Sequence, residues 1–234
     1  MGPMQALILA SGRGTRMGEL TSDTPKPLLQ VAGKSLIEHK LEALPSAVDE
    51  VVVVVGYQGD AIKECFRDES HGRRIVYVQQ EILDGTAKGV WAAKDVLHDR
   101  FLVLMGDDLY CREDMECCIL TPDWSMVVAP VGAMGAGGRV EVDQRGVITG
   151  IEEGDHEGRP GLVGTNLFVL DTRFFDMPPV PKAPGSEEYG LPQTAVMIST
   201  AEAIPFHAIE TRFWHQVTSP EDLIEAEKRL SVVK

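Results

Sequence analysis

The chain has 234 residues, 44% of them hydrophobic and 25% charged, so it can bury a substantial core as one domain and leaves no room for a second full domain. Its formal charge of −14 argues against a general nucleic-acid binder or a membrane-surface protein, because both need a basic surface. No apolar run approaches the ~20 residues of a membrane span, and no charged N-terminal region precedes a long apolar stretch, so we expect a cytoplasmic protein.

Apolar runs and helical patterns alternate in the first half of the chain. The apolar runs predict strands at 5–9, 50–55, 75–79 and 101–105. Between them, the spacing of apolar residues predicts helices at 35–44, from the turn at 56–59 through Phe66, and at 87–97. Ser35 and Glu38 form a capping box at the start of the first helix. Strand and helix alternate four times, so right-handed crossovers predict a doubly wound, mainly parallel, Rossmann-like α/β sheet.

The pattern changes after about residue 125. Short strands separated by glycine-rich turns are expected at 126–130, 139–142, 147–152, 163–170, 203–208 and 211–217. They predict a mixed or antiparallel C-terminal extension of the sheet. The proline-rich stretch 177–192 is expected to be a loop at the border of a site, and Ser219 with Pro220 to start the last helix. We therefore expect one domain over 1–234, with halves of about 4–124 and 125–234.

A loop with two glycines follows the first predicted strand. Gly12 and Gly14 lack a Cβ, so the backbone can direct several N–H groups at a phosphate. Residues 10–34 hold cationic side chains at 13, 16, 26 and 34 and acidic ones only at 19 and 23, which concentrates positive charge where a phosphate would bind. The loop matches neither Gly-x-Gly-x-x-Gly nor a Walker loop. A lone Gly-x-Gly is more often an ordinary strand-to-helix turn.

The wider string around this loop favours ligand binding. Leu-Ala-Ser-Gly-Arg-Gly-Thr-Arg-Met at 9–17, Pro-Lys-Pro-Leu-Leu at 25–29 and the segment 31–38 together resemble the signature of the sugar-1-phosphate nucleotidyltransferases, the nucleotide-sugar pyrophosphorylases. The resemblance covers most of the chain. It implies a nucleotide-binding loop made of Leu9, Ala10, Ser11, Gly12, Arg13, Gly14 and Thr15. It also implies two catalytic side chains: Arg16 on the β- and γ-phosphates, and Lys26 between the α-phosphate and the sugar phosphate.

Two further segments follow the third and fourth predicted strands, at the sheet edge where the first loop should also lie. Gln80 offers a donor and an acceptor to a base, and Gly85 lets a base lie against the backbone. The structural alternative is that this segment is only the start of a helix capped by Thr86. The segment matches the family's pattern of Gln, four residues and Gly, and this resemblance implies that Gln80, Gly85 and Thr86 bind nucleotide. Asp107 stands in the family's Gly-Asp metal motif, which implies Mg²⁺, with Asp108 secondary; a solvated turn is the alternative.

The segments 138–143 and 151–153 look like the family's sugar-side strands. By this resemblance Glu153 accepts hydrogen bonds from sugar hydroxyls, with the backbone of Gly138 nearby and Asn166 as a further sugar contact. The next residues depart from the pattern, because Gly154 stands where a lysine usually follows, and Gly-Thr-Asn at 164–166 replaces Asn-Thr-Gly. A surface charge or a turn is an equal alternative for each position.

The segment 211–222 looks like the family's C-terminal Trp-x-Asp-Val-Gly-Thr-Pro-Glu-Asp, whose aspartate or asparagine supplies a second metal ligand. Gln216 stands in that position. Its amide oxygen can bind Mg²⁺ but carries no charge and lies one methylene further out. The alternative is that Gln216 only caps a strand and the metal uses Asp108.

The resemblance implies an enzyme that transfers a nucleotidyl group from an NTP to a sugar 1-phosphate, with Mg²⁺ as cofactor, releasing pyrophosphate and forming a nucleotide sugar. UTP or dTTP is expected before purine nucleotides. The alternatives are a cytidylyltransferase that uses an alcohol phosphate and a catalytically weak nucleotide-sugar sensor or regulatory subunit. The expected partners are an NTP and a sugar 1-phosphate, and neither nucleic acid nor a membrane is expected. The sequence is compatible with a homo-oligomer.

Overall fold

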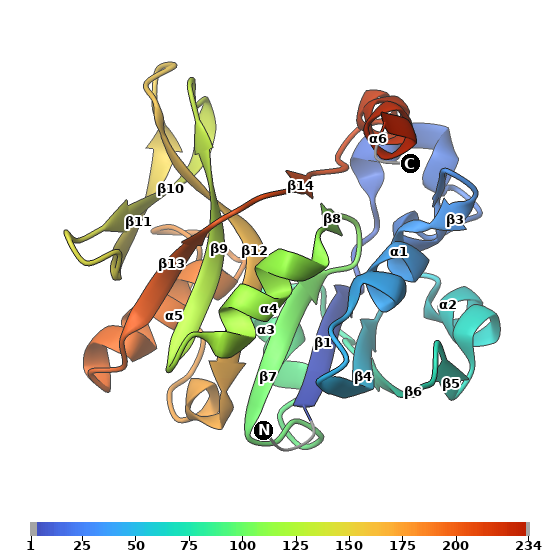
Figure 1. The fold of residues 1–234 in the computed structure, drawn as a ribbon, viewed down its shortest axis with the longest axis horizontal. Coiled ribbons are helices and arrows are strands. Elements are labelled where there is room, and N and C mark those ends of the chain that lie inside the picture. Colours follow the sequence, from blue (N-terminus) through green and yellow to red (C-terminus); the bar gives the residue numbers. More distant parts are fainter. Residues whose placement is uncertain (1–3, 233–234) are drawn as a thin grey trace.

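The computed structural model describes residues 4–232, and a twisted sheet runs through the middle of it (Figure 1). Its first half is parallel, in the spatial order β7 (Arg100–Met105), β1 (Met4–Ala10), β4 (Val48–Val55), β6 (Arg73–Gln79). The short strand β5 (Glu69–Ser70) pairs antiparallel with β6 at the edge. This order confirms the predicted doubly wound, mainly parallel sheet.

Helices cover both faces of this sheet (Figure 1). Alternate residues of β1 point to opposite faces, so Ala6 and Ile8 join one core cluster and Leu7 and Leu9 the other. On the first face lie α1 (Leu36–Ala43), α2 (Gly59–Phe66) and α4 (Arg112–Leu120). On the second lie α3 (Thr86–Ala92) and α5 (Leu191–Ala201). Burial on both faces explains why the strand sequences are continuously apolar.

The second half extends the sheet with mostly antiparallel strands, which confirms the predicted mixed extension. β12 (Gly161–Asp171) runs antiparallel to β7 and is followed outward by β10 (Ala136–Val142) and β11 (Ile148–Asp155). β9 (Trp124–Val131) pairs with β12 and, in parallel, with β13 (Phe206–Glu210). The short 3-10 helix η3 (Thr172–Phe175) follows β12.

The end of the chain returns to the first half of the molecule (Figure 1). β14 (Trp214–His215) pairs antiparallel with β8 (Leu109–Tyr110), and α6 (Pro220–Val232) then packs against the segments that follow the first loop. Those segments are η1 (Thr15–Thr21), η2 (Lys26–Leu28) and the hairpin of β2 (Gln30–Val31) and β3 (Lys34–Ser35). Over residues 4–232, no helix is long and apolar enough to cross a membrane.

Several local predictions need correction. The helices α4 and α5 were not predicted, and the helix predicted at 87–97 ends at Ala92. Pro192 indicated a loop, but it lies in the first turn of α5, where the missing N–H breaks no intrahelical hydrogen bond. The capping box of α1 is present as predicted, because Ser35 Oγ accepts from the N–H of Glu38 and the Glu38 carboxylate from the N–H of Ser35.

Candidate active site

A cavity of about 720 Å³ opens at the carboxyl ends of β1, β6 and β7, with β10, β11 and the start of α5 as its other wall. The predicted site residues that line it are Leu9, Ser11, Gly12, Arg13, Thr15, Arg16, Gln80, Gly85, Thr86, Asp107, Gly138, Glu153, Asn166 and Gln216. Ala10, Gly14 and Lys26 are not part of the lining. The structure therefore gathers candidates from both halves of the chain around one space.

The first loop owes its shape to Gly14 and to the segment behind it. Gly14 has a φ of +63°, and a Cβ there would lie 2.9 Å from the Cβ of Lys26. The N–H of Met17 donates to the Gly14 carbonyl at 2.9 Å, and the buried Met17 side chain anchors η1. A Cβ at Gly12 would meet nothing within 4 Å. Gly14 thus permits close packing on Lys26, whereas Gly12 leaves its backbone open to the cavity.

Lys26 and Asp107 form an ion pair in which only Asp107 lines the cavity. Lys26 lies in η2 between two prolines, is 6% exposed, and its Nζ donates to Asp107 Oδ2 at 2.6 Å. The Asp107 side chain comes directly after β7, is 28% exposed and faces the cavity. The sequence analysis predicted a phosphate contact for Lys26 and a metal ligand for Asp107. In the structure the two side chains are paired, although they lie 81 residues apart in the sequence.

Asp108 also lines the cavity, although it is almost fully buried. It is 3% exposed, and its Oδ2 accepts a hydrogen bond from Trp214 Nε1 at 3.0 Å. Burial raises the pKa of Asp108 to about 7, and the charge of Asp107 acts in the same direction. The pairing of β14 with β8 places Trp214 opposite Tyr110 and brings Gln216 to the cavity. Asp107 and Gln216, the two predicted metal ligands, therefore line the same space.

A buried lysine that the sequence analysis missed lies beneath this acidic pair. Lys40 is 1% exposed, and its Nζ donates to the Leu36 carbonyl at 2.9 Å. Burial lowers the pKa of Lys40 to about 8, although the charges of Asp107 and Asp108 raise it. The sequence contained a signal for this burial, because helical spacing places Lys40 one turn after Leu36 on the apolar face of α1.

Gln80 connects the first loop to the loop after β6. Its Oε1 accepts from Ser11 Oγ at 2.5 Å, and its Nε2 donates to the carbonyls of Ile82 at 3.0 Å and Gly85 at 3.3 Å. Both amide protons of Gln80 are therefore used within the protein, and one lone pair of Oε1 is left for a base. Base recognition by Gln80 stays a prediction.

Gly85 lies against the backbone of Tyr189. Its φ is +114°, and a Cβ there would overlap the Tyr189 main chain. The N–H of Tyr189 donates to the Asp84 carbonyl at 2.7 Å, and the N–H of Ala87 to the Tyr189 carbonyl at 3.1 Å. Two hydrogen bonds thus join the loop after β6 to the segment before α5, and this junction requires a glycine whether or not a base binds there.

We expect Gly85→Ala to lower the free energy of unfolding by about 2 kcal/mol or more, because alanine is strained at this φ and its methyl group would displace Tyr189. For a domain of this size the melting temperature should fall by roughly 4–8 °C, measured by calorimetry. The control is Gly72→Ala, where φ is +70° and a Cβ meets nothing within 4 Å. Equal losses in the two variants would show that the Tyr189 contact contributes nothing.

Glu153 forms part of the opposite wall. It pairs in register with Gly138 across β10 and β11, and a Cβ at Gly138 would lie 2.8 Å from Glu153 Oε1. The same oxygen accepts a hydrogen bond from Gln193 Nε2 at 2.7 Å. Both predicted sugar-side residues, Gly138 and Glu153, therefore lie beside each other, as the resemblance implies.

Asn166 lies at an irregularity in β12. The register with β9 shifts between Gly164 and Phe168, and Asn166 has a φ of +58°. Buried Thr165 holds this bulge, because its Oγ1 donates to the Val127 carbonyl at 3.0 Å and its carbonyl accepts from Tyr110 Oη at 2.9 Å. The departure from the family pattern at 164–166 thus forms a bulge that faces the cavity.

The segment before α5 and the first turn of α5 also contribute lining residues that the sequence did not identify individually, namely Lys182, Glu188, Tyr189 and Gly190 from the segment and Gln193 from the helix. The stretch 177–192 was predicted to be a loop at the border of a site; part of it lines the cavity, and its last two residues belong to α5. No local pattern could have identified Gln193, because its partner lies 40 positions earlier.

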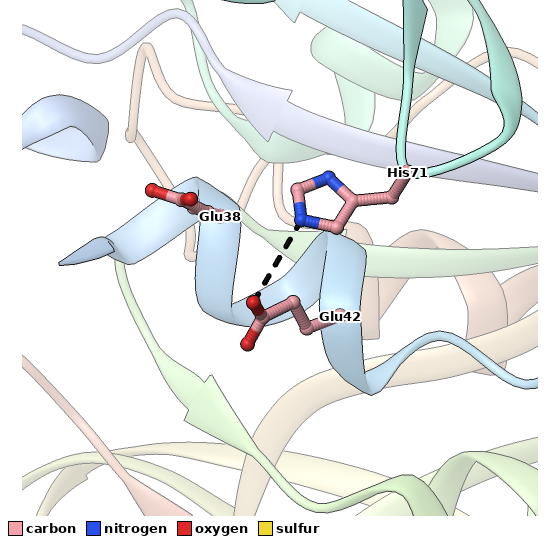
Figure 2. A group of neighbouring side chains, drawn as sticks. All are labelled: Glu38, Glu42 and His71. Atoms are coloured by element: carbon pink, nitrogen blue, oxygen red, sulfur yellow. Dashed lines mark ion pairs between the residues drawn. The ribbon is translucent and has the colours of Figure 1, made fainter.

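A second group of metal-type ligands, Glu38, Glu42 and His71, lies on the outer surface of α1 (Figure 2). His71 Nε2 is 3.8 Å from Glu42 Oε1, but Lys34 Nζ already donates to both oxygens of Glu42, at 2.6 and 2.7 Å. Glu38 belongs to the capping box of α1. Glu38 is therefore engaged at the start of α1 and Glu42 in its last turn, while His71 comes from the turn between β5 and β6.

Comparison with known proteins found matches over nearly the whole chain. A family model described as nucleotidyl transferase matches residues 5–231. The chain is 28% identical over 227 residues to the bifunctional protein GlmU of Methanocaldococcus jannaschii, covering 97% of this chain and 54% of that protein. It is 27% identical over 242 residues to the UTP–glucose-1-phosphate uridylyltransferase AglF of Haloferax volcanii, covering 97% and 96%. The chain thus spans about half the length of the GlmU proteins it matches.

A solved structure shows the same fold. HddC from Yersinia pseudotuberculosis superposes with a TM-score of 0.74 at 18% sequence identity, covering 97% of this chain and 99% of that one. The agreement extends over both the parallel half and the mixed extension, since nearly the whole of each chain is matched.

Proposed function

Because this chain belongs to the nucleotidyl transferase family, we propose that it joins an NTP to a sugar 1-phosphate, releasing pyrophosphate and forming a nucleotide sugar. The observation that supports this most is the single cavity lined by the first loop, by Asp107, whose carboxylate pairs with Lys26, and by the Glu153 wall. One wall offers backbone N–H groups and arginines suited to phosphates, and the other offers a carboxylate suited to sugar hydroxyls.

In this reaction an oxygen of the sugar phosphate attacks the α-phosphorus in line, the bond from the α-phosphorus to the β-bridging oxygen breaks, and pyrophosphate leaves. No covalent enzyme intermediate is required, so positioning and charge neutralisation account for the catalysis. Within residues 4–232 Arg16 makes no ion pair, which leaves its guanidinium available to the β- and γ-phosphates. Lys26 would place its charge between the two reacting phosphates.

The residues at the inner end of the cavity fit a magnesium ion. Asp107 Oδ2 is taken by Lys26, which leaves Oδ1, and among the described residues the Gln216 side chain has no hydrogen-bond partner. Both groups offer the oxygen ligands that Mg²⁺ prefers. Asp107 with Gln216 would therefore hold the ion, which when bound supplies positive charge to the triphosphate.

We expect Mg²⁺-dependent pyrophosphate release only when an NTP and a sugar 1-phosphate are both present. A coupled pyrophosphate assay over a matrix of nucleotides, sugar 1-phosphates and alcohol phosphates tests this. Pyrophosphate release with an alcohol phosphate in place of a sugar 1-phosphate would favour the cytidylyltransferase alternative. Uridine or deoxythymidine triphosphate is expected to give the highest rate. Nucleotide binding without turnover across the matrix would favour the sensor or regulatory subunit, which the uncharged Gln216 keeps as the second candidate. A cytoplasmic location and assembly into a homo-oligomer stay predictions.

A further inference from the structure

The wall opposite the first loop contains one polar contact that the sequence motifs do not include. Gln193, the third residue of α5, donates from Nε2 to Glu153 Oε1 on β11 at 2.7 Å, and both side chains line the cavity. We infer that Gln193 is a positioning residue for the second substrate, because it fixes the Glu153 carboxylate in the orientation that accepts a sugar hydroxyl. This inference rests on the proposed function.

Glu153 Oε1 is held from two sides. On one side is the Cα of Gly138, where an added Cβ would come within 2.8 Å of this oxygen, so a larger residue would displace the carboxylate. On the other side is the Gln193 amide. With Oε1 engaged in this way, Oε2 is the oxygen available to a ligand. An ionised carboxylate only accepts hydrogen bonds, so this position favours a substrate that presents a hydroxyl there.

The orientation of the Gln193 amide supports a role beyond packing. Its Oε1 is buried and has no hydrogen-bond partner within the part of the chain that the structure describes, and it lies against Gly190, where a Cβ would overlap it. An unpaired buried carbonyl is unfavourable, and such a group in a native protein calls for an explanation. The reverse orientation would point this oxygen at the Glu153 carboxylate. The Gln193 amide therefore keeps its contact with Glu153 at the expense of its own carbonyl.

The first test is Gln193→Leu, which keeps much of the side-chain volume and removes the donor. We expect the KM for the sugar 1-phosphate to rise about tenfold, since a hydrogen bond to a charged group is lost, while the KM for the NTP and the melting temperature change little. A purely structural role would raise both KM values together or lower the melting temperature. Either of those results, or an unchanged KM for the sugar 1-phosphate, would overturn the inference.

The second test is Gln193→Glu, which places two carboxylates at this contact. Two ionised carboxylates repel each other, whereas a proton shared between them replaces the hydrogen bond that Gln193 donates to Glu153. The KM for the sugar 1-phosphate should therefore be raised at pH 8 and recover toward pH 6, where such a proton binds more readily. The matched control is Gln144→Glu, the same change in the exposed turn between β10 and β11, which should leave both KM values as in the wild type. A pH profile identical to that control would contradict the inference.

Calorimetric binding of the sugar 1-phosphate and of the NTP to each protein distinguishes a failure of the proposed function from a failure of the role inferred for Gln193. A wild-type protein that binds NTP but no sugar 1-phosphate would overturn the proposed function, and the inference with it. A wild-type protein that releases pyrophosphate, together with a Gln193→Leu variant that binds sugar 1-phosphate equally well, would overturn the inference alone.

Discussion

Lys26→Met is expected to lower turnover about 100-fold or more, because a preorganised charge that acts on the transition state typically contributes roughly 3 kcal/mol. Lys26 has a fixed starting point between Pro25 and Pro27, and its ammonium is held by Asp107 at 2.6 Å. The methionine has a similar length, and the Asp107 side chain that it leaves without a partner is 28% exposed and so reaches water. The free energy of unfolding should therefore change by only about 1–2 kcal/mol, less than when a fully buried pair is broken.

The matched control for this prediction is Lys34→Met. Lys34 also loses an ion pair of 2.6 Å, with Glu42, but this pair lies on the surface outside the cavity. Single-turnover rates and thermal unfolding of the two variants can be compared directly. Near-normal turnover in Lys26→Met, or an equal loss in Lys34→Met, would remove Lys26 from the mechanism.

Asp107→Ala is expected to nearly abolish activity, because a single carboxylate is both the partner of Lys26 and the charged ligand proposed for Mg²⁺. Gln216→Asp is expected to act in the opposite direction. A second carboxylate at the cavity should lower the Mg²⁺ concentration needed for half-maximal rate by about tenfold, which corresponds to ~1.4 kcal/mol. Magnesium titrations of initial rate at saturating substrates measure both effects.

Asp108→Asn tests the alternative ligand. Asparagine keeps an oxygen that can accept from Trp214 Nε1 and removes a carboxyl group that burial already keeps partly protonated near pH 7. Only a small change in the Mg²⁺ dependence is expected. If Asp107→Ala remained active, Gln216→Asp left the Mg²⁺ dependence unchanged and Asp108→Asn abolished activity, the metal site would move from Asp107 to Asp108.

Features that depend on short spacing along the chain could be predicted from the amino-acid sequence. The continuous apolar runs determined which strands are buried on both faces, as in β1 and β4, because such runs suit no other position in an α/β fold. The order of motifs then placed the first loop, Gln80 and Asp107 at the carboxyl ends of parallel strands, and these ends meet at one edge. The helix at Leu191 could not be predicted, since Pro192 is compatible both with a loop and with the first turn of a helix.

Contacts between residues far apart in the sequence became known only from the folded structure. Asp107 and Asp108 both line the cavity, but only Asp108 is almost fully buried, because the pairing of β8 with β14 brings Trp214 to one of the two adjacent carboxylates. Gly85 is required by Tyr189, and Glu153 is oriented by Gln193, through contacts that form when α5 packs behind the sheet. Such contacts depend on which faces of separate elements come together, and the spacing of residues within one element carries no information about this.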